Sequence, residues 1–200
     1  MYYLFILAIG AERLIEMVVS RRNANWSFAN GGKEFGRGHF PVMVGMHTLL
    51  LVSCVAEVAV FHRPFLPWLG WPMVGVVALS TLMRWWCVAV LGKHWNPRLI
   101  VIPGAPLVHR GPYRFLHHPN YTAVTAEVVA LPLVHSAWLT AIVFTIANAL
   151  VLNVRIRAEN LALGYARLTA GSASSPVRPW PWRSTAAARC RRTRSPRRVR

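Results

Sequence analysis

The sequence predicts an all-α integral membrane protein, built as a bundle of about five transmembrane helices. Three observations favour this fold class: 54% of the 200 residues are hydrophobic, long apolar stretches recur, and Lys and Arg gather in alternate connections between them. A soluble nucleic-acid-binding protein would share the formal net charge of +17 but not the apolar excess. A disordered basic chain would not carry nine Trp and eight Phe.

The apolar stretches have roughly the lengths that membrane-spanning helices need. They are expected at Tyr2–Ser20, Phe40–Phe61, Trp68–Leu91, Tyr121–Val134 and Ser136–Val154. The first lacks a basic leading segment and is interrupted by Glu12, Arg13 and Glu16, so it does not fit a signal peptide; these charges are expected near the interface or facing the bundle. The fourth is short and is expected to be tilted, kinked near Pro132 or extended. Because almost no linker separates the last two, they predict a helical hairpin.

The distribution of positive residues predicts how the helices are oriented. The connections at 20–40 and 92–120 each carry four Lys or Arg, and twelve follow Val154. The loop between the second and third stretches carries only Arg63, and the turn between the fourth and fifth carries none. The positive-inside rule therefore places the N-terminus outside, and both long connections and the C-terminus in the cytoplasm.

Residues 1–163 are expected to form the membrane domain, and residues 164–200 a basic tail. Gly, Ser, Pro, Ala and Arg dominate the tail, which holds ten of the 23 Lys and Arg residues, so it is predicted to be disordered. It can be interpreted as a binder of RNA or of anionic lipid headgroups, or as a solvated appendage. The last interpretation is favoured, so no specific nucleic-acid partner is expected.

Polar residues concentrate at 103–121 and at 153–160, and the hairpin is expected to bring both segments to the cytoplasmic face. Arg155 and Glu159 are four residues apart on one helix face. They form either an interfacial ion pair or a clamp for a zwitterionic ligand, with Glu159 on an ammonium group and Arg155 on a carboxylate or an oxygen-rich headgroup. Taken alone, His118-Pro119 indicates only a helix start.

Three further features have a structural and a functional interpretation. The glycine-rich segment at 31–41 is either a flexible connector or a lid at a substrate entrance. His47, Glu57 and Glu127 lie inside apolar stretches, where ionisable residues are functional candidates, although pairing between helices also explains them. No metal site is predicted, because neither the histidines nor the three cysteines have ligand spacing.

Two motifs point to a known family. The segment Gly111–Tyr121, which reads GPYRFLHHPNY, and the later Arg155–Glu159, which reads RIRAE, flank the predicted hairpin. Together they resemble the isoprenylcysteine carboxyl methyltransferase family. The Gly31–Gly36 segment and His39-Phe40-Pro41 are similar to a bacterial branch associated with methylation of alkylpyrone-type polyketides. The resemblance covers roughly residues 1–163.

This resemblance implies a membrane-embedded methyltransferase, in a bacterial inner membrane, with a cytoplasmic pocket for S-adenosylmethionine. The residues implied to line that pocket are Ala105, Pro106, Leu107, Val108, Tyr113, His118, Pro119, Asn120 and Tyr121. Glu159 is implied to hold the cofactor and Arg155 to face the methyl acceptor, with Arg98 as a further lining residue. Many members have a second Glu where this chain has Asn160, so a role for paired carboxylates is not carried over.

The implied acceptor is lipophilic and enters from the membrane lipids. It is either the carboxyl group of an isoprenylcysteine or the hydroxyl of an alkylpyrone-type polyketide. A carboxylate needs no general base, whereas a phenol or enol would benefit from one, for which His117 and His118 are the candidates. Phospholipid N-methylation and a non-catalytic membrane protein are the alternative functions.

Overall fold

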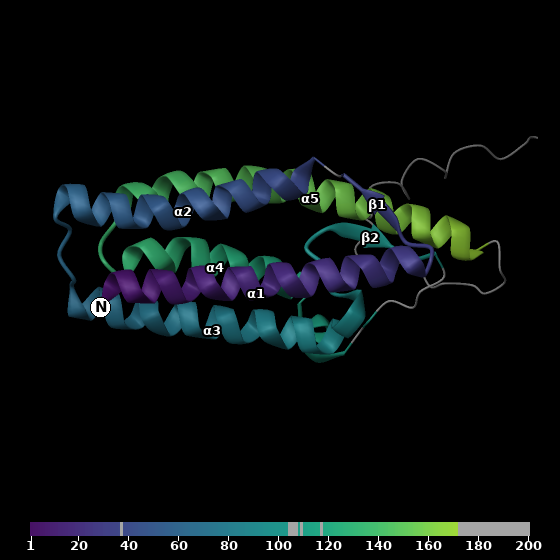
Figure 1. Ribbon diagram of the computed structural model, residues 1–200, viewed down its shortest axis with the longest axis horizontal. Helices are drawn as coiled ribbons and strands as arrows, with labels where there is room; N and C mark the ends of the chain where they lie inside the picture. The colour runs from purple at the N-terminus through teal and green to yellow at the C-terminus, as the bar shows by residue number, and fades with distance from the viewer. Residues whose placement is uncertain (37, 104–107, 109, 117, 172–200) are drawn as a thin grey trace, which may run out of the picture.

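The computed structural model describes the chain except residues 37, 104–107, 109, 117 and 172–200. Five long helices form the described part, which confirms the all-α bundle (Figure 1). They are α1 (Tyr2–Ala29), α2 (His39–Phe61), α3 (Pro67–Leu91), α4 (Pro119–Leu133) and α5 (Trp138–Gly171). The predicted tail boundary after residue 163 therefore falls inside α5, and the predicted disorder of residues 172–200 lies outside the described residues.

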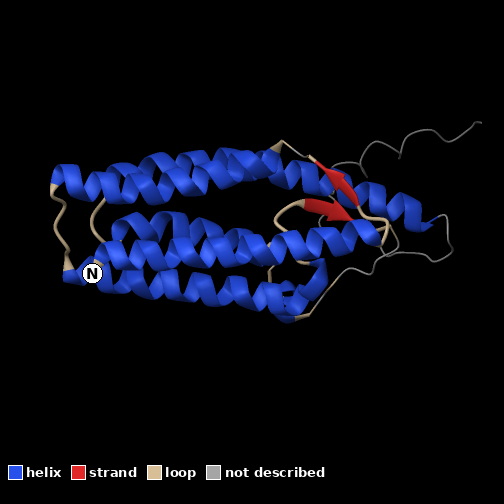
Figure 2. Ribbon diagram, in the orientation of Figure 1, coloured by secondary structure: helices blue, strands red, loops and turns tan. Residues whose placement is uncertain are grey.

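The helices run alongside one another, and the two ends of the bundle differ (Figure 1). The chain's N-terminus, the α2–α3 loop and the α4–α5 turn lie at one end, here called the N-terminal end. Two short strands, β1 (Lys33–Phe35) and β2 (Leu99–Val101), lie toward the other, here called the sheet end (Figure 2). Of the Lys and Arg in the described residues, only Arg63 belongs to the N-terminal end.

The outer faces of the bundle are apolar. Leu14, Val52, Leu82 and Leu150 are each more than half exposed. Within the part of the chain that the structure describes, three helical segments are long and apolar enough to cross a membrane, at His39–Phe61, Pro67–His94 and Trp138–Ala162. A soluble bundle would place polar groups on such faces, so lipid is the solvent that fits them. The protein is therefore a membrane protein, with α1 and the shorter α4 packed among the three apolar helices.

The predicted hairpin is present. Proline at its first turn starts α4, because Pro119 needs no backbone partner there. The helix ends at Leu133 with Pro132 inside its last turn, and α5 begins at Trp138. Ser136 has a positive φ of 55° in the intervening turn. This tight reversal sets α4 directly against α5.

The two-stranded sheet was not expected. The strands pair antiparallel, with Lys33 opposite Val101, Glu34 opposite Ile100 and Phe35 opposite Leu99. Strands of three residues are too short to give a periodic signal in the sequence. Gly36, with φ +61°, turns the chain from β1 toward α2, and a Cβ there would lie 2.6 Å from His39 Nδ1. Residues 33–36 of the glycine-rich segment thus belong to the sheet end and do more than connect two helices.

Charged residues inside the bundle pair with one another. Arg13 donates to Glu16 at 2.6 Å and to both oxygens of Glu127. Arg84 donates to Glu16, with Nε 2.9 Å from Oε1, and its Nη1 lies 3.5 Å from Glu127. These contacts join α1, α3 and α4. The charges of the first stretch were expected to face the bundle or to lie near the interface. Arg13 and Glu16 face the bundle.

At the N-terminal end, Glu57 holds the start of α5. Its carboxylate accepts hydrogen bonds from the backbone N–H groups of Thr140 at 2.7 Å and Leu139 at 3.2 Å, and it pairs with Arg63 at 3.0 Å. Unsatisfied N–H groups and the helix dipole both favour a negative charge at this position.

We expect Glu57→Gln to lower the free energy of unfolding by about 1–3 kcal/mol, because the first turn of α5 loses its anionic cap. Arg63→Gln is the matched control and is expected to lower it by less than about 1 kcal/mol, because Arg63 is partly exposed and the cap stays. Unfolding in mixed micelles measures both values. Equal losses for the two variants would contradict the capping role.

Candidate active site

The hairpin brings the two sequence motifs together near the sheet end. His118 is the N-cap of α4, so Tyr121 lies in the first turn of that helix. Arg155 and Glu159 lie one turn apart on α5, which packs along α4. The connection that precedes α4 is fixed to α1, because Asn23 donates to the carbonyls of Gly92 and Trp95. All groups of the candidate site are thus carried by packed elements.

Arg155 is a buried cation without a carboxylate partner among the described residues. Its side chain is largely enclosed, with the residue 9% exposed. Nε donates to Tyr121 Oη at 2.8 Å and Nη2 donates to the carbonyl of Pro97, whereas the acceptor of Nη1 among the described residues is the sulfur of Met43, at 3.0 Å. A thioether is a weak acceptor. The guanidinium therefore keeps both an uncompensated charge and a poorly used donor.

Tyr121 links Arg155 to Glu159. Its hydroxyl accepts from Arg155 and donates to Glu159 Oε2. The imidazole of His118 stacks on the Tyr121 ring, with centroids 5.1 Å apart and planes at 15°, and its Nδ1 lies 3.9 Å from Glu159 Oε2. Arg155 and Glu159 do not form the simple ion pair that their spacing allowed. The phenol holds them apart, so the cation and the carboxylate are both offered to a ligand.

Two other motif residues border this group. Tyr113 lies in the short helix Gly111–Arg114, and burial, followed by the neighbouring Cys87 thiol, raises the pKa of its phenol. The phenol therefore stays protonated at neutral pH and can donate. Asn120 has a buried Oδ1 with no hydrogen-bond partner in the part of the chain that the structure describes. A buried oxygen without a hydrogen-bond partner destabilises the folded protein. A ligand that donates a hydrogen bond to Oδ1 would remove this cost.

A cavity at the sheet end reaches Arg155. It is a small crevice with room for about one water molecule, lined by Arg155, Pro97, Arg98 and Leu99, and by Glu34, Gly36, His39 and Phe40. Arg98 Nε lies 3.6 Å from Glu34, and its guanidinium is 5.2 Å from the Phe40 ring centroid. The glycine-rich segment thus forms one wall of the space in front of Arg155.

The structure brings together Tyr121, His118, Arg155 and Glu159 of the predicted site. Pro119 starts α4, the helix that carries Tyr121, and Val108 is half-buried in the connection before it. Ala105, Pro106, Leu107 and His117 lie outside the described residues. The sequence analysis missed Met43 and Pro97, since contacts from a sulfur and from a backbone carbonyl leave no sequence signal.

Comparison with known proteins agrees with these motifs. Residues 73–165 match the model of the isoprenylcysteine carboxyl methyltransferase (ICMT) family. The chain is 39% identical over 164 residues to the uncharacterized protein YpbQ of Bacillus subtilis. The aligned region covers 82% of this chain and 96% of that relative. It is 23% identical over 160 residues to an uncharacterized protein of Haemophilus influenzae, covering 78% of this chain and 91% of that one.

The fold defines an α-helical membrane protein with polar residues gathered toward one end of an apolar bundle. The chain belongs to the isoprenylcysteine carboxyl methyltransferase family, and the family assignment makes it a methyltransferase. Members of this family use S-adenosylmethionine.

Proposed function

We propose that this protein is an S-adenosylmethionine-dependent O-methyltransferase whose acceptor is lipophilic and reacts as an anion. The buried guanidinium of Arg155, which lacks a carboxylate partner among the described residues, carries this proposal. A buried charge is stable when a counter-charge completes it. A carboxylate, or the oxygen anion of an enol or phenol, supplies that charge and uses the Nη1 donor now facing Met43.

The residues present fit the cofactor. Glu159 is 24% exposed in its side chain and offers a carboxylate for the cofactor's ammonium group. The ring faces of Tyr113 and Tyr121 suit a sulfonium cation, and the free Oδ1 of Asn120 suits an adenine or ribose donor. When bound, S-adenosylmethionine supplies an electrophilic methyl group.

The chain's own groups account for the remaining needs of methyl transfer. Arg155 pairs with the acceptor oxygen, orients it and lowers its pKa, so an enol or phenol binds already ionised. Tyr121 fixes Arg155 relative to Glu159 through two hydrogen bonds, and hence acceptor relative to cofactor. The burial of Arg155 limits the access of water to the acceptor oxygen. His118 is the candidate base for an acceptor that enters protonated.

The same observation disfavours phospholipid N-methylation, because an amine acceptor becomes cationic as it gains a methyl group and Arg155 would repel it. The acceptor is therefore proposed to be an isoprenylcysteine carboxyl or an alkylpyrone-type hydroxyl. We also propose that the sheet end faces the cytoplasm of a bacterial inner membrane, where the water-soluble cofactor is available. The excess of Lys and Arg at that end supports this orientation.

Labelled-methyl transfer from S-adenosylmethionine into a bacterial lipid extract, with mass spectrometry of the product, tests the proposal. An ester or methyl ether is expected. Label found only in methylated ethanolamine lipids would refute O-methylation, and no label together with no cofactor binding by the purified protein would refute the enzyme assignment.

We expect Glu159→Gln to weaken S-adenosylmethionine binding by about 100-fold, because a neutral amide replaces the carboxylate that pairs with the ammonium group. Isothermal titration of the detergent-purified protein measures this effect. Asn160→Ala is the matched control, since Asn160 is the next residue on α5 and is exposed, and it is expected to bind normally. Normal binding by Glu159→Gln would remove Glu159 from the cofactor site.

A further inference from the structure

The crevice in front of Arg155 is also lined by a group that can take a proton. Its lining combines the Arg155 guanidinium of α5 with the His39 imidazole of α2. The other charged groups on its wall are Glu34 of β1 and Arg98, which directly precedes β2, and Arg98 Nε lies 3.6 Å from the Glu34 carboxylate. A carboxylate beside a guanidinium is a weaker base than a neutral imidazole. Among the described residues that line the crevice, His39 is therefore the group best suited to accept a proton.

The turn from β1 into α2 fixes the position of His39. Its backbone N–H donates to the carbonyl of Gly36 at 3.0 Å, and α2 begins at His39 itself. Gly36 has φ +61°, and a Cβ there would lie 2.6 Å from Nδ1 and 3.0 Å from Cε1 of the His39 ring. The imidazole thus lies against a glycine that also lines the crevice, and a side chain at position 36 would displace the ring.

His39 also lies close to the poorly used donor of Arg155. His39 is four residues before Met43 on α2, so the two share one face of the helix, with their Cβ atoms about 5–6 Å apart. The sulfur of Met43 lies 3.0 Å from Nη1 of Arg155. An acceptor oxygen that takes the place of this sulfur is therefore within about one helical turn of the imidazole. The crevice has room for about one water molecule, and hence for one such oxygen.

His118, the other candidate base, contacts the groups proposed to hold the cofactor. Its ring stacks on Tyr121, and its Nδ1 lies 3.9 Å from Glu159 Oε2. Of the two histidines, His39 lines the crevice and His118 does not. The geometry therefore pairs His39 with the acceptor and His118 with the cofactor.

We propose that His39, rather than His118, is the general base that takes the proton from an acceptor hydroxyl as its oxygen pairs with Arg155. The inference rests on the proposed function, because it takes Arg155 as the anchor of the acceptor. The O–H bond of the acceptor breaks, and its proton passes to a nitrogen of the His39 imidazole. The oxygen then forms the new O–C bond, while the S–C bond to the methyl group breaks and its electron pair stays on the sulfur. His39 is partly exposed, so the imidazolium returns the proton to water.

This assignment makes the need for His39 depend on the acidity of the acceptor. A phenol, with a pKa of about 10 like that of tyrosine, is protonated at neutral pH and needs the base. A hydroxypyrone is a much stronger acid and is ionised at neutral pH, so it pairs with Arg155 without losing a proton in the site. A carboxylate behaves in the same way. His39 thus extends the range of acceptors from acidic groups to weakly acidic hydroxyls.

Two synthetic acceptors with the same alkyl chain, an alkylphenol and an alkyl hydroxypyrone, test this role. Glutamine is polar and of similar size but cannot take the proton. At neutral pH, His39→Gln is expected to lower kcat/KM for the phenol by about 100-fold and for the hydroxypyrone by less than about threefold. Raising the pH should reduce the loss for the phenol, because a growing share of it binds already ionised. Equal losses for both acceptors, or no methylation of the phenol by the unmodified protein, would overturn the inference.

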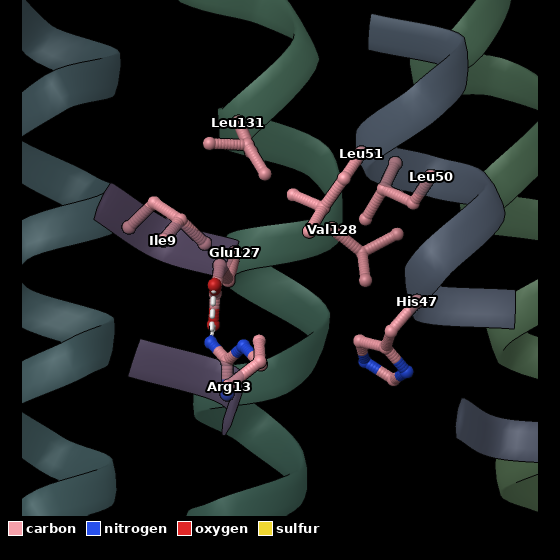
Figure 3. Close-up of a pocket in the computed structure, with 8 residues that line it drawn as sticks. All are labelled: Ile9, Arg13, His47, Leu50, Leu51, Glu127, Val128 and Leu131. Carbon is pink, nitrogen blue, oxygen red and sulfur yellow. Dashed lines mark hydrogen bonds and ion pairs between the residues drawn. The ribbon is translucent and has the colours of Figure 1, made fainter. Parts of the chain in front are cut away.

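His47→Gln is the matched control on the same helix. His47 lies about two turns beyond His39, and its Nδ1 is 2.8 Å from a backbone carbonyl oxygen. Figure 3 shows His47 across from the joined Arg13 and Glu127 side chains, beside a small void that shares no lining residue with the crevice. His47→Gln is therefore expected to leave the ratio of kcat/KM for the two acceptors unchanged. A selective loss for the phenol as large as that of His39→Gln would contradict the assignment of the base to the crevice.

His118→Gln separates the two candidate bases. It is expected to lower kcat/KM for both acceptors by the same factor, because His118 lies beside the groups proposed to hold the cofactor. A selective loss for the phenol in His118→Gln, with none in His39→Gln, would place the base at His118 and overturn the inference.

Binding of the alkylphenol without the cofactor gives a readout that does not depend on turnover. The absorption band of the bound phenolate is expected to appear at lower pH in the unmodified protein than in His39→Gln, because His39 takes the proton. Appearance of the band at the same pH in both proteins would overturn the role of His39.

These outcomes separate the inference from the proposed function. If neither the synthetic acceptors nor the lipid extract gives an O-methylated product, the proposed function fails. If the hydroxypyrone is methylated and its methylation depends on Arg155, but His39→Gln affects both acceptors equally, only the inference about His39 fails.

Discussion

Replacing Arg155 by methionine is expected to lower the rate of methyl transfer by at least about 100-fold while S-adenosylmethionine binding changes by less than about threefold. Methionine retains much of the side-chain volume, so the packing against Met43 and Pro97 changes little. The substitution removes the positive charge that pairs with the acceptor oxygen. It also removes the planar guanidinium N–H donors that orient this oxygen. Single-turnover methyl transfer and isothermal titration on the same preparation measure the two effects.

Arg155→Lys is the control that separates charge from geometry. Lysine keeps the positive charge but cannot contact Tyr121, Met43 and Pro97 together, so a partial loss is expected. If Arg155→Met binds cofactor poorly and transfers methyl normally once saturated, Arg155 belongs to the cofactor rather than to the acceptor. That result would contradict the proposal that the acceptor reacts as an anion, since the proposal rests on Arg155 having no carboxylate partner among the described residues.

The sequence motifs name the candidate residues of the site, but they do not give the contacts between these residues. The spacing of Arg155 and Glu159 placed them on one helix face and left a plain ion pair as one interpretation. The structure shows instead that Tyr121 lies between them. That contact spans more than thirty residues and depends on how α4 packs on α5. A single sequence records the local period of a helix, whereas the rotation of one helix against another is set by side-chain packing.

For the fold too, local features could be predicted from the sequence and contacts between distant segments could not. Hydropathy and the distribution of Lys and Arg predicted the five helices, because each of these signals lies within one segment. The pairing of β1 with β2 was not predicted, since it joins Glu34 to Ile100 across most of the first half of the chain. The first and fifth helices are longer than the apolar stretches that predicted them. Both helices continue beyond their apolar part, to Ala29 and Gly171, where hydropathy gives no signal but the backbone remains helical.

The buried charges between α1, α3 and α4 make the bundle sensitive to the loss of any one of them. Arg84 is 6% exposed and Glu16 is equally buried, and the two are joined through two hydrogen bonds. Glu12 and Glu127 lie against the same group, through Arg13. Three carboxylates thus depend on two guanidinium groups. In an apolar bundle, each cation neutralises more than one neighbour, so the loss of one cation affects the whole group.

Arg84→Met is therefore expected to lower the free energy of unfolding by about 3–5 kcal/mol, because Glu16 loses its main partner and remains buried. The double variant Arg84→Met with Glu16→Leu is expected to be less destabilised than Arg84→Met alone, since it removes the stranded carboxylate as well. Unfolding of each variant in mixed micelles measures the difference, and the Glu16→Leu single variant completes the cycle. Additive losses in the double variant would mean that the two side chains are not coupled, contrary to their contact in the structure.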